Sequence, residues 1–215
     1  MSRDGWFGPR WIGLLALVLG SLSGATALQA QWDVICYVGS AAGQPVSLCV
    51  YPDGDGSRPG DSLDACFTYG GTIADATITL NLYDWDYNPV PYFPAEDLWL
   101  ETEDGGMVLC PGGSIADSDT DLNGMTTFSG PLRAGGSGEG IIVLVNGMLC
   151  PLPALAIKIN SPDLNGDLVV NLSDIVLFAN SFLGEYSYAC DFYWDGDINL
   201  SDLVMLSNGM GAACP

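Results

Sequence analysis

The sequence contains no histidine and few basic residues: 5 Lys and Arg stand against 26 Asp and Glu in 215 residues, a formal charge of −21. The absence of His excludes Ser-His and Cys-His catalytic arrangements and the common zinc ligand sets. The excess negative charge repels nucleic acids and anionic lipids. Cations are therefore the expected ligands, and we expect oxygen atoms to hold any metal ion.

No apolar run reaches the ~20 residues that a membrane-spanning helix needs. One shorter run, over residues 11–19, follows two arginines and precedes a stretch of small residues. This order is typical of a secretory signal peptide. We predict a signal peptide over residues 1–30, cleaved after Ala27 or Ala30. The mature chain is then secreted, extracellular or at the cell surface, and not inserted into a membrane.

No CxxC pair occurs among the seven cysteines, so neither a thiolate metal site nor a redox motif has support. Because export brings the chain into an oxidising environment, we expect disulfides. The odd number leaves one thiol over, and connectivity cannot be deduced from spacing. We favour Cys49 with Cys110, because each ends a strand-like run.

Long segments of helical period are absent between the signal peptide and residue 160, where short alternating runs are broken by Gly, Pro, Asn and Asp. In two runs the apolar residues listed next occupy every second position, so they lie on one face, as in a half-buried strand. Their apolar residues are Ile78, Leu80 and Leu82, and Leu155, Ile157 and Ile159. The run GIIVLVNG at 140–147 is apolar throughout, which suits a strand buried on both faces. With DLWLET, MVLC and MTTFSG, about seven strands predict an immunoglobulin-like β-sandwich over residues 31–158.

Two turns in this region carry a family resemblance. LYDWDYNPVPYFPAEDLWLE (82–101) and DSDTDLNGMTTFSGPLRAGG (117–136) resemble the turns of bacterial immunoglobulin-like domains of the invasin type. The resemblance covers about residues 70–147. Trp85 and Tyr87 depart from it, because small turn residues are usual there. It implies a passive extracellular sandwich, used as a spacer or adhesive module, with no active site.

Two acidic clusters in the same region have two interpretations. Asp53, Asp55 and Asp61 form one cluster, and the run DSDTD at 117–121 forms the other. Each could seat a calcium ion between loops, but Asp, Asn and Gly are also what turns require. We interpret both as turns, because neither is followed by a helix that would complete a calcium loop. No pair of acids stands out as a glycosidase acid and base, and we predict that the chain is not an enzyme.

The C-terminal part of the sequence repeats itself. DLNGDLVVNLSD (163–174) and DFYWDGDINLSD (191–202) match at six of twelve positions at an offset of 28. Each segment leads into a run of helical period. The residues predicted to form the helix core are Ile175, Phe178, Phe182, Leu203, Leu206 and Met210.

The spacing of acids within each repeat is that of a twelve-residue calcium loop, which takes ligands from positions 1, 3, 5, 7 (backbone carbonyl), 9 and 12. We therefore predict two calcium sites. The first consists of Asp163, Asn165, Asp167, the carbonyl of Val169, Asn171 and Asp174. The second consists of Asp191, Asp195, the carbonyl of Asp197, Asn199 and Asp202.

Each loop has one flaw. The second has Tyr193 at position 3, where a side-chain oxygen ligand is expected. The first has Leu168 at position 6, where Gly is wanted for a positive φ angle, whereas the second has Gly196. Helix capping is the alternative explanation of the acids, but Asp174 and Asp202 alone would suffice for capping.

The duplicated loop–helix pattern resembles the type I dockerin domain, and the match covers about residues 161–214. The resemblance implies a small all-α, dockerin-like domain over residues 159–215 with two calcium-binding loop–helix repeats. It also implies docking onto a cohesin-like domain or another cell-surface protein. The docking residues it implies are Leu172, Ser173, Leu200 and Ser201, which we expect to be partly exposed.

These observations predict a secreted, non-catalytic calcium-binding protein that docks onto a partner and uses the sandwich as a spacer or adhesive module. The alternative is a carbohydrate-binding or glycoside-hydrolase accessory component of a cellulosome-like, polysaccharide-degrading complex.

Overall fold

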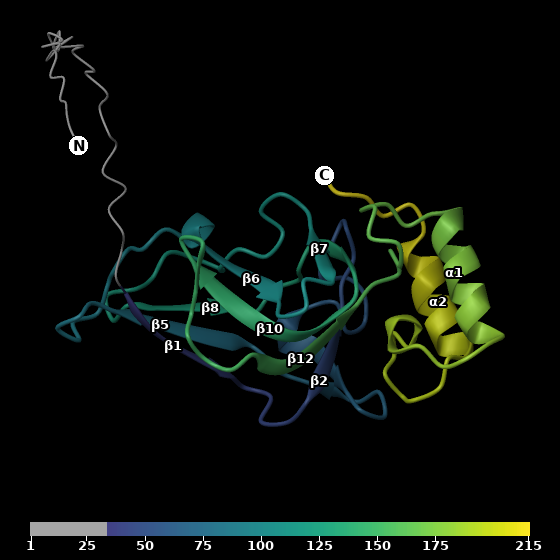
Figure 1. Ribbon diagram of the computed structural model, residues 1–215, viewed down its shortest axis with the longest axis horizontal. Helices are drawn as coiled ribbons and strands as arrows, with labels where there is room; N and C mark the ends of the chain where they lie inside the picture. Colours follow the sequence, from purple (N-terminus) through teal and green to yellow (C-terminus); the bar gives the residue numbers. More distant parts are fainter. Residues whose placement is uncertain (1–33) are drawn as a thin grey trace, which may run out of the picture. The chain divides into compact units, whose positions relative to one another are not determined.

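A computed structural model describes residues 34–215, which belong to one compact unit (Figure 1). The predicted signal peptide at residues 1–30 lies outside the described residues. No helix in the described range is long and apolar enough to cross a membrane.

Three β-sheets make up most of the structure. β1 (Ile35–Ser40), β5 (Ile78–Tyr83) and β8 (Met125–Phe128) form an antiparallel sheet in the order β1-β5-β8, and β7 (Met107–Leu109) pairs with β9 (Ala134–Gly136). The largest sheet has the order β11-β10-β12-β2-β3-β4, with β6 on β10, and only its β12–β2 pair is parallel. Its strands are β2 (Val46–Cys49), β3 (Cys66–Thr68), β4 (Ile73–Ala74), β6 (Leu98–Thr102), β10 (Gly138–Val145), β11 (Met148–Leu149) and β12 (Leu155–Asn160).

Two short helices complete the chain, α1 (Leu172–Phe182) and α2 (Leu200–Gly209), and Figure 1 shows them side by side at one end of the β-sheets. Single 3-10 turns lie at Leu63–Ala65 (η1), Ala95–Asp97 (η2) and Tyr188–Cys190 (η3). The predicted fold class is therefore wrong: the described chain is a β-rich fold with several sheets and two helices, not a β-sandwich followed by an all-α domain.

The helices do not have a core of their own, which explains this error. Three of the six predicted core residues, Phe182, Leu203 and Met210, are 40 to 41% exposed. The helices instead share a buried cluster with the β-sheet part. This cluster joins Cys49, Tyr51 and Phe67 with Val170, Phe178, Cys190, Phe192, Trp194, Met205, Leu206 and Ala212.

The strand predictions are mostly confirmed. β5 alternates buried and half-buried residues, and Ile157 and Ile159 of β12 are buried. Burial of β10 on both faces is wrong, because Ile142 and Leu144 are only half-buried while Ile141, Val143 and Val145 are buried. The larger sheet therefore covers the core with one face of β10.

Two disulfides cross-link the chain, Cys36–Cys150 and Cys110–Cys214. They indicate a non-reducing environment. The predicted pair Cys49–Cys110 is wrong, because Cys49 lies buried in the core shared with the helices while Cys110 is bonded to Cys214. Cys49, Cys66 and Cys190 are buried free thiols, and burial raises the pKa of Cys66 to about 12.

We predict that Phe67→Ala destabilises the sheets and the helices together. Phe67 is 1% exposed in the shared core, so its truncation should cost about 3–5 kcal/mol. Denaturation followed at a helix-sensitive far-ultraviolet wavelength and by near-ultraviolet circular dichroism should give one shifted, coincident transition. Ile73→Ala, at a 56% exposed position of the adjacent strand, is the control. Helices that unfold at an unchanged denaturant concentration would contradict the shared core.

Candidate calcium loops and the helix face

The acidic clusters in the β-sheet part are turns held together by their own hydrogen bonds and by the ion pairs of Arg58 with Asp53 and Asp55. Arg58 donates to both carboxylate oxygens of Asp53, at 2.8 and 2.9 Å. In the second cluster, Asp117 accepts hydrogen bonds from the hydroxyls of Thr127 and Ser129. These carboxylates therefore bind donors within the β-sheet part. The candidate metal site is in the C-terminal repeats.

The aspartate at position 1 of each repeat is fully buried: Asp163 in loop 1 (residues 163–174) and Asp191 in loop 2 (residues 191–202). Each carboxylate accepts hydrogen bonds from the backbone amides of positions 5 and 6. The donors are Asp167 (3.2 Å) and Leu168 (2.8 Å) in loop 1, and Asp195 (3.1 Å) and Gly196 (3.0 Å) in loop 2. Both loops therefore curl around a buried negative charge.

The aspartate at position 12, Asp174 or Asp202, is also fully buried and closes its loop onto the following helix. One oxygen accepts from the start of the loop and the other from the amide of position 9. The donors are Leu164 (2.9 Å), Asn165 (3.2 Å) and Asn171 (2.8 Å) in loop 1, and Tyr193 (3.0 Å) and Asn199 (2.9 Å) in loop 2. The two sequence repeats therefore also have the same pattern of hydrogen bonds.

Each helix begins with a capping box. Asn171 and Asn199 are the N-cap residues, and their side chains accept from the amides of Ser173 (2.8 Å) and Ser201 (2.7 Å). Capping accounts for the residues at positions 9 and 12. It does not account for the buried aspartates at position 1, which lie well before the helices.

The turn at position 6 requires a left-handed backbone in both loops. Gly196 has a φ of 95°, and Leu168 takes a φ of 66° despite its side chain. A non-glycine residue in this region costs on the order of 1 kcal/mol. Loop 1 therefore adopts the calcium-loop turn at an energetic cost. This cost indicates that the shape of the turn is required.

Burial makes the negative charge of these loops unfavourable. It raises the pKa of Asp163, with repulsion from Asp174 adding to the effect, and it also raises the pKa of Asp191 and Asp202. Ion pairs within residues 34–215 join Arg58 to its neighbouring aspartates and Lys158 to Glu139, so none of the four buried loop carboxylates is paired with a basic side chain there.

The described residues hold no preformed group of three or more His, Cys, Asp or Glu side chains that could bind a metal ion. In loop 1 the amide nitrogens of Asn165 and Asn171 turn toward Asp167 and the carbonyl of Val169, both at 2.9 Å. Asn165 and Asp167 are exposed, so their side chains can rotate without disturbing the core, whereas Asn171 is half-buried and caps α1. Once the side chains of Asn165 and Asp167 have rotated, the oxygen donors of loop 1 match the set that calcium prefers.

In loop 2 the predicted ligands Asp195 and Asn199 are half-buried and Asp197 is exposed. The Asn199 amide nitrogen donates to the Asp195 carboxylate, at 3.2 Å to the nearer oxygen. Position 3 contributes no oxygen to this loop, because the ring of Tyr193 packs on Phe67 with 4.9 Å between centroids.

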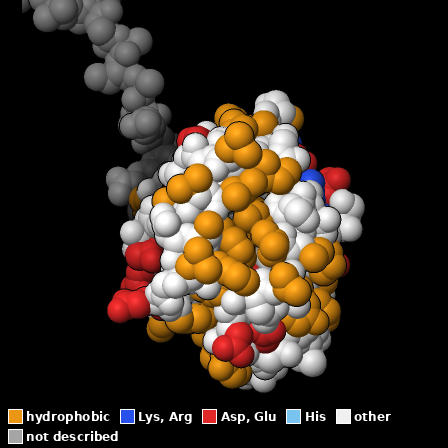
Figure 2. Space-filling view, turned by 90° about the vertical axis from the view of Figure 1, so that its right-hand side faces the viewer, with side chains coloured by type: hydrophobic (Ala, Val, Ile, Leu, Met, Phe, Trp, Pro, Cys, Tyr) orange, Lys and Arg blue, Asp and Glu red, His pale blue; other side chains and the backbone are white. Residues whose placement is uncertain are grey.

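The predicted docking residues are exposed. Leu172 is 74% and Leu200 70% exposed, and Ser173 and Ser201 are exposed beside them. We call the exposed apolar side chains of the two helices the helix face; Figure 2 views the molecule from the helix side and shows apolar side chains gathered across it. The helix face consists of Leu172, Val176, Leu177, Phe182, Leu200, Leu203 and Val204.

Sequence reasoning missed Val176 and Val204. They occupy equivalent positions of the repeat, and both are more than half exposed, at 61 and 56%. The offset of 28 that identified the leucines and serines also relates these valines. The repeat itself was therefore the signal that could have extended the predicted face.

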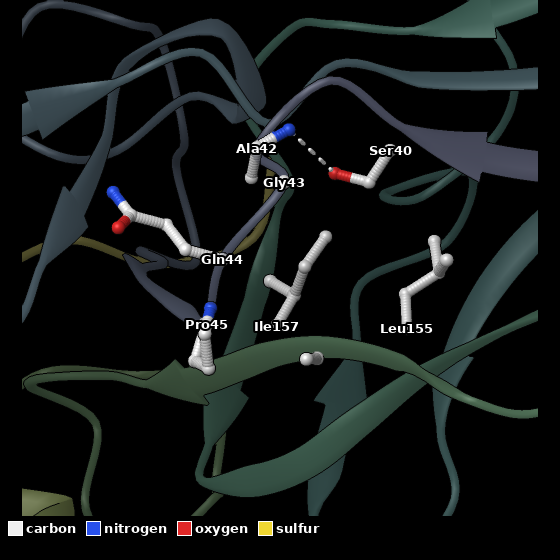
Figure 3. Close-up of a pocket in the computed structure, with 8 residues that line it drawn as sticks. Ser40, Ala42, Gly43, Gln44, Pro45, Leu155 and Ile157 are labelled. Carbon is white, nitrogen blue, oxygen red and sulfur yellow. Dashed lines mark hydrogen bonds between the residues drawn. The ribbon is translucent and has the colours of Figure 1, made fainter.

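An open cavity of about 360 Å³ lies between the β1–β2 turn and β12, away from the helices (Figure 3). Its lining residues include Ser40, Gln44 and Ile157 but no acid, base or thiol. The Ser40 hydroxyl donates to the carbonyl of Ala76 (3.1 Å) and accepts from the amide of Ala42 (3.3 Å). Ser40 therefore lacks the adjacent base that activates a nucleophile.

No protein-family model, curated protein or solved structure matches the chain. The assignment to a type I dockerin domain and an invasin-type immunoglobulin-like domain is wrong, because no family model matches and the described chain is mostly β-sheet with two short helices that share its core.

We predict that the carboxyl groups of Asp163, Asp191 and Asp202 titrate above the ordinary Asp pKa of about 3.9 in chelator. In contrast, hydrogen bonds from Asn88 lower the pKa of Asp84. Carboxyl-carbon nuclear magnetic resonance titration measures both groups in one sample.

The raised pKa values fix the sign of their effect on stability. Without calcium, the three groups contribute stability below the unfolded pKa of about 3.9 and lose it as pH rises through their folded values. Titration of all three below Asp84 would show that the loops already compensate their charge without a cation.

Proposed function

We propose that this chain is an extracellular, non-catalytic binding protein in which calcium stabilises the loop–helix repeats and the helix face binds a protein partner. The observation that carries the proposal is the burial of two aspartates per loop with no basic partner among the described residues. A buried charge of this kind is costly unless a counter-charge neutralises it.

Calcium supplies the missing positive charge when it is bound. In loop 1 the ligands would be the side chains of positions 1, 3, 5 and 12, the carbonyl of position 7, and position 9 through water. These are Asp163, Asn165, Asp167, Asp174, Val169 and Asn171. Loop 2 offers a shorter set: Asp191, Asp195, Asp202, Asn199 and the carbonyl of Asp197.

The helix face supports a docking role. It places several exposed apolar side chains on two adjacent helices, which is typical of a protein-binding surface. No Lys or Arg follows Lys158, whereas acids are frequent in this part of the chain. The matching partner is therefore a protein surface with an apolar centre and a rim of basic residues. The β-sheet part would then act as the support that holds the helix face in position.

Carbohydrate binding by the β-sheet part is a second candidate, favoured by one turn. Trp85 and Tyr87 in this turn, and Tyr92 in the turn that follows it, are 66 to 68% exposed. Asp84 fixes the turn by accepting from the amides of Asp86 (2.9 Å) and Asn88 (2.8 Å). Aromatic rings held at the surface can stack on the apolar faces of sugars.

Calcium should stabilise the whole compact unit. A ligand that binds only the folded chain stabilises it by about 2.7 kcal/mol at one hundred times its dissociation constant. We expect the thermal midpoint in calcium to exceed that in chelator, and Asp163→Ala to abolish most of this difference. Asp121→Asn, in an exposed turn of the β-sheet part, should leave it unchanged. Equal midpoints in calcium and chelator would remove the basis of the proposal.

The docking role predicts the behaviour of Leu172→Asp combined with Leu200→Asp. Both leucines are largely exposed, so each change should alter stability by less than about 0.5 kcal/mol. Loss of apolar contacts at the centre of an interface should weaken binding by ~2 kcal/mol or more. Both changes are needed because the two helices carry equivalent surfaces.

The assay is calcium-dependent capture of a partner from the secreted proteins of the producing cells. Leu122→Asp is the matched control, since Leu122 is 71% exposed in the β-sheet part. The helix face is supported if only the double variant loses capture while remaining folded. Unchanged capture would refute this surface, and loss of folding would show that the leucines are structural.

A further inference from the structure

The two loops differ at position 3. In loop 1, Asn165 is exposed and its side-chain oxygen accepts from the amide of Asp167 at 3.0 Å. In loop 2, the amide of Tyr193 donates to Asp202 at 3.0 Å, as the amide of Asn165 does to Asp174 in loop 1. The ring of Tyr193, however, turns toward β3 and lies against Gly71, where an added Cβ would fall 2.1 Å from the ring. Loop 2 therefore keeps the backbone of a calcium loop without the ligand at this position.

Loop 2 also has a hydrogen bond that loop 1 lacks. The Tyr186 hydroxyl donates to a carboxylate oxygen of Asp191 at 2.8 Å. Asp163 and Asp191 each accept from two backbone amides of their own loop, and Asp191 accepts this hydroxyl as a third donor. A hydroxyl donor offsets part of the negative charge that a cation would otherwise neutralise.

Aromatic contacts hold loop 2 against the β3–β4 hairpin. The Trp194 ring packs edge-on against Tyr69, with 5.8 Å between centroids, and the amide of Gly70 donates to the carbonyl of Trp194 at 2.9 Å. The Tyr69 hydroxyl lies over Gly196, where a Cβ would fall 2.4 Å from it. Loop 2 is therefore fixed in shape by protein contacts.

Loop 1 has no aromatic residue within it, and Asn165 and Asp167 face solvent. Its contacts with the β-sheet part are not aromatic ring contacts on the loop's ligand positions: the amide of Gly136 donates to the carbonyl of Asp163 at 2.8 Å, Gly135 lies against the Asp163 carboxylate, and Val108 lies against Gly166. Its oxygen donors at positions 1, 3, 5, 9 and 12 are complete.

We propose that loop 1 binds one calcium ion and that loop 2 binds none, because Tyr186 and Tyr193 have replaced the ion in loop 2 with protein contacts. The proposal rests on the calcium role proposed above and reduces the two predicted ions to one. The second repeat is then a metal-free copy that keeps α2 in place through its tyrosines and tryptophan.

The test is calorimetric calcium titration of the full secreted chain with its disulfides formed, after treatment with chelator. Asp167→Ala and Asp195→Ala are a matched pair, because they remove the side-chain oxygens at position 5 of loops 1 and 2. We expect one ion in the unchanged chain, none in Asp167→Ala and one in Asp195→Ala. The double variant Tyr186→Phe with Tyr193→Asn should gain a second ion, since it restores a position-3 oxygen and removes the hydroxyl bond. Circular dichroism in chelator checks that each variant folds.

Two ions in the unchanged chain, with one lost in each Asp variant, would overturn the proposal while supporting the calcium role. One ion that is lost in Asp195→Ala and kept in Asp167→Ala would overturn it as well. No binding by the unchanged chain would instead refute the calcium role itself. A folded Tyr double variant that still binds one ion would show that the tyrosines do not exclude calcium from loop 2.

Discussion

Each loop of the C-terminal repeat buries two aspartate side chains, and the positions of both helices depend on how this negative charge is compensated. Asp163 and Asp191 gather the backbone amides of their loops, and Asp174 and Asp202 connect each loop to the first turn of its helix. Backbone amides supply only partial positive charge, and no basic side chain among the described residues completes it. We propose that a cation compensates this charge in loop 1; in loop 2 the Tyr186 hydroxyl donates to Asp191.

The same loops attach the helices to the β-sheets. Loop 1 lies against β9 and loop 2 against the β3–β4 hairpin, while Phe178 and Leu206 pack into a core shared with Phe67. The Cys110–Cys214 disulfide fixes the end of the chain to the same β-sheet part. Because one side of each helix is used in this way, the leucines and valines outside the shared core remain exposed.

The sequence allowed prediction of features that depend on local pattern. The repeat located both loops and the exposure of Leu172 and Leu200, and alternation located β5 and β12. Features that depend on distant contacts were not predictable. An apolar stripe shows that a helix is buried on one side but not what covers it, so the core shared with the β-sheets was missed. Spacing likewise left the pairing of Cys110 open, and nothing in the sequence showed that Tyr193 turns toward Phe67.

The central claim is that a cation compensates the buried aspartates of loop 1. A crystal structure of the full chain grown in calcium, with an anomalous difference map recorded at long wavelength, tests it most directly. We expect one peak in loop 1, at about 2.3–2.6 Å from oxygen atoms of Asp163, Asp167, Asp174 and the carbonyl of Val169. An empty loop 1 in such crystals, with Asp163 and Asp174 still buried and unpaired, would contradict the claim.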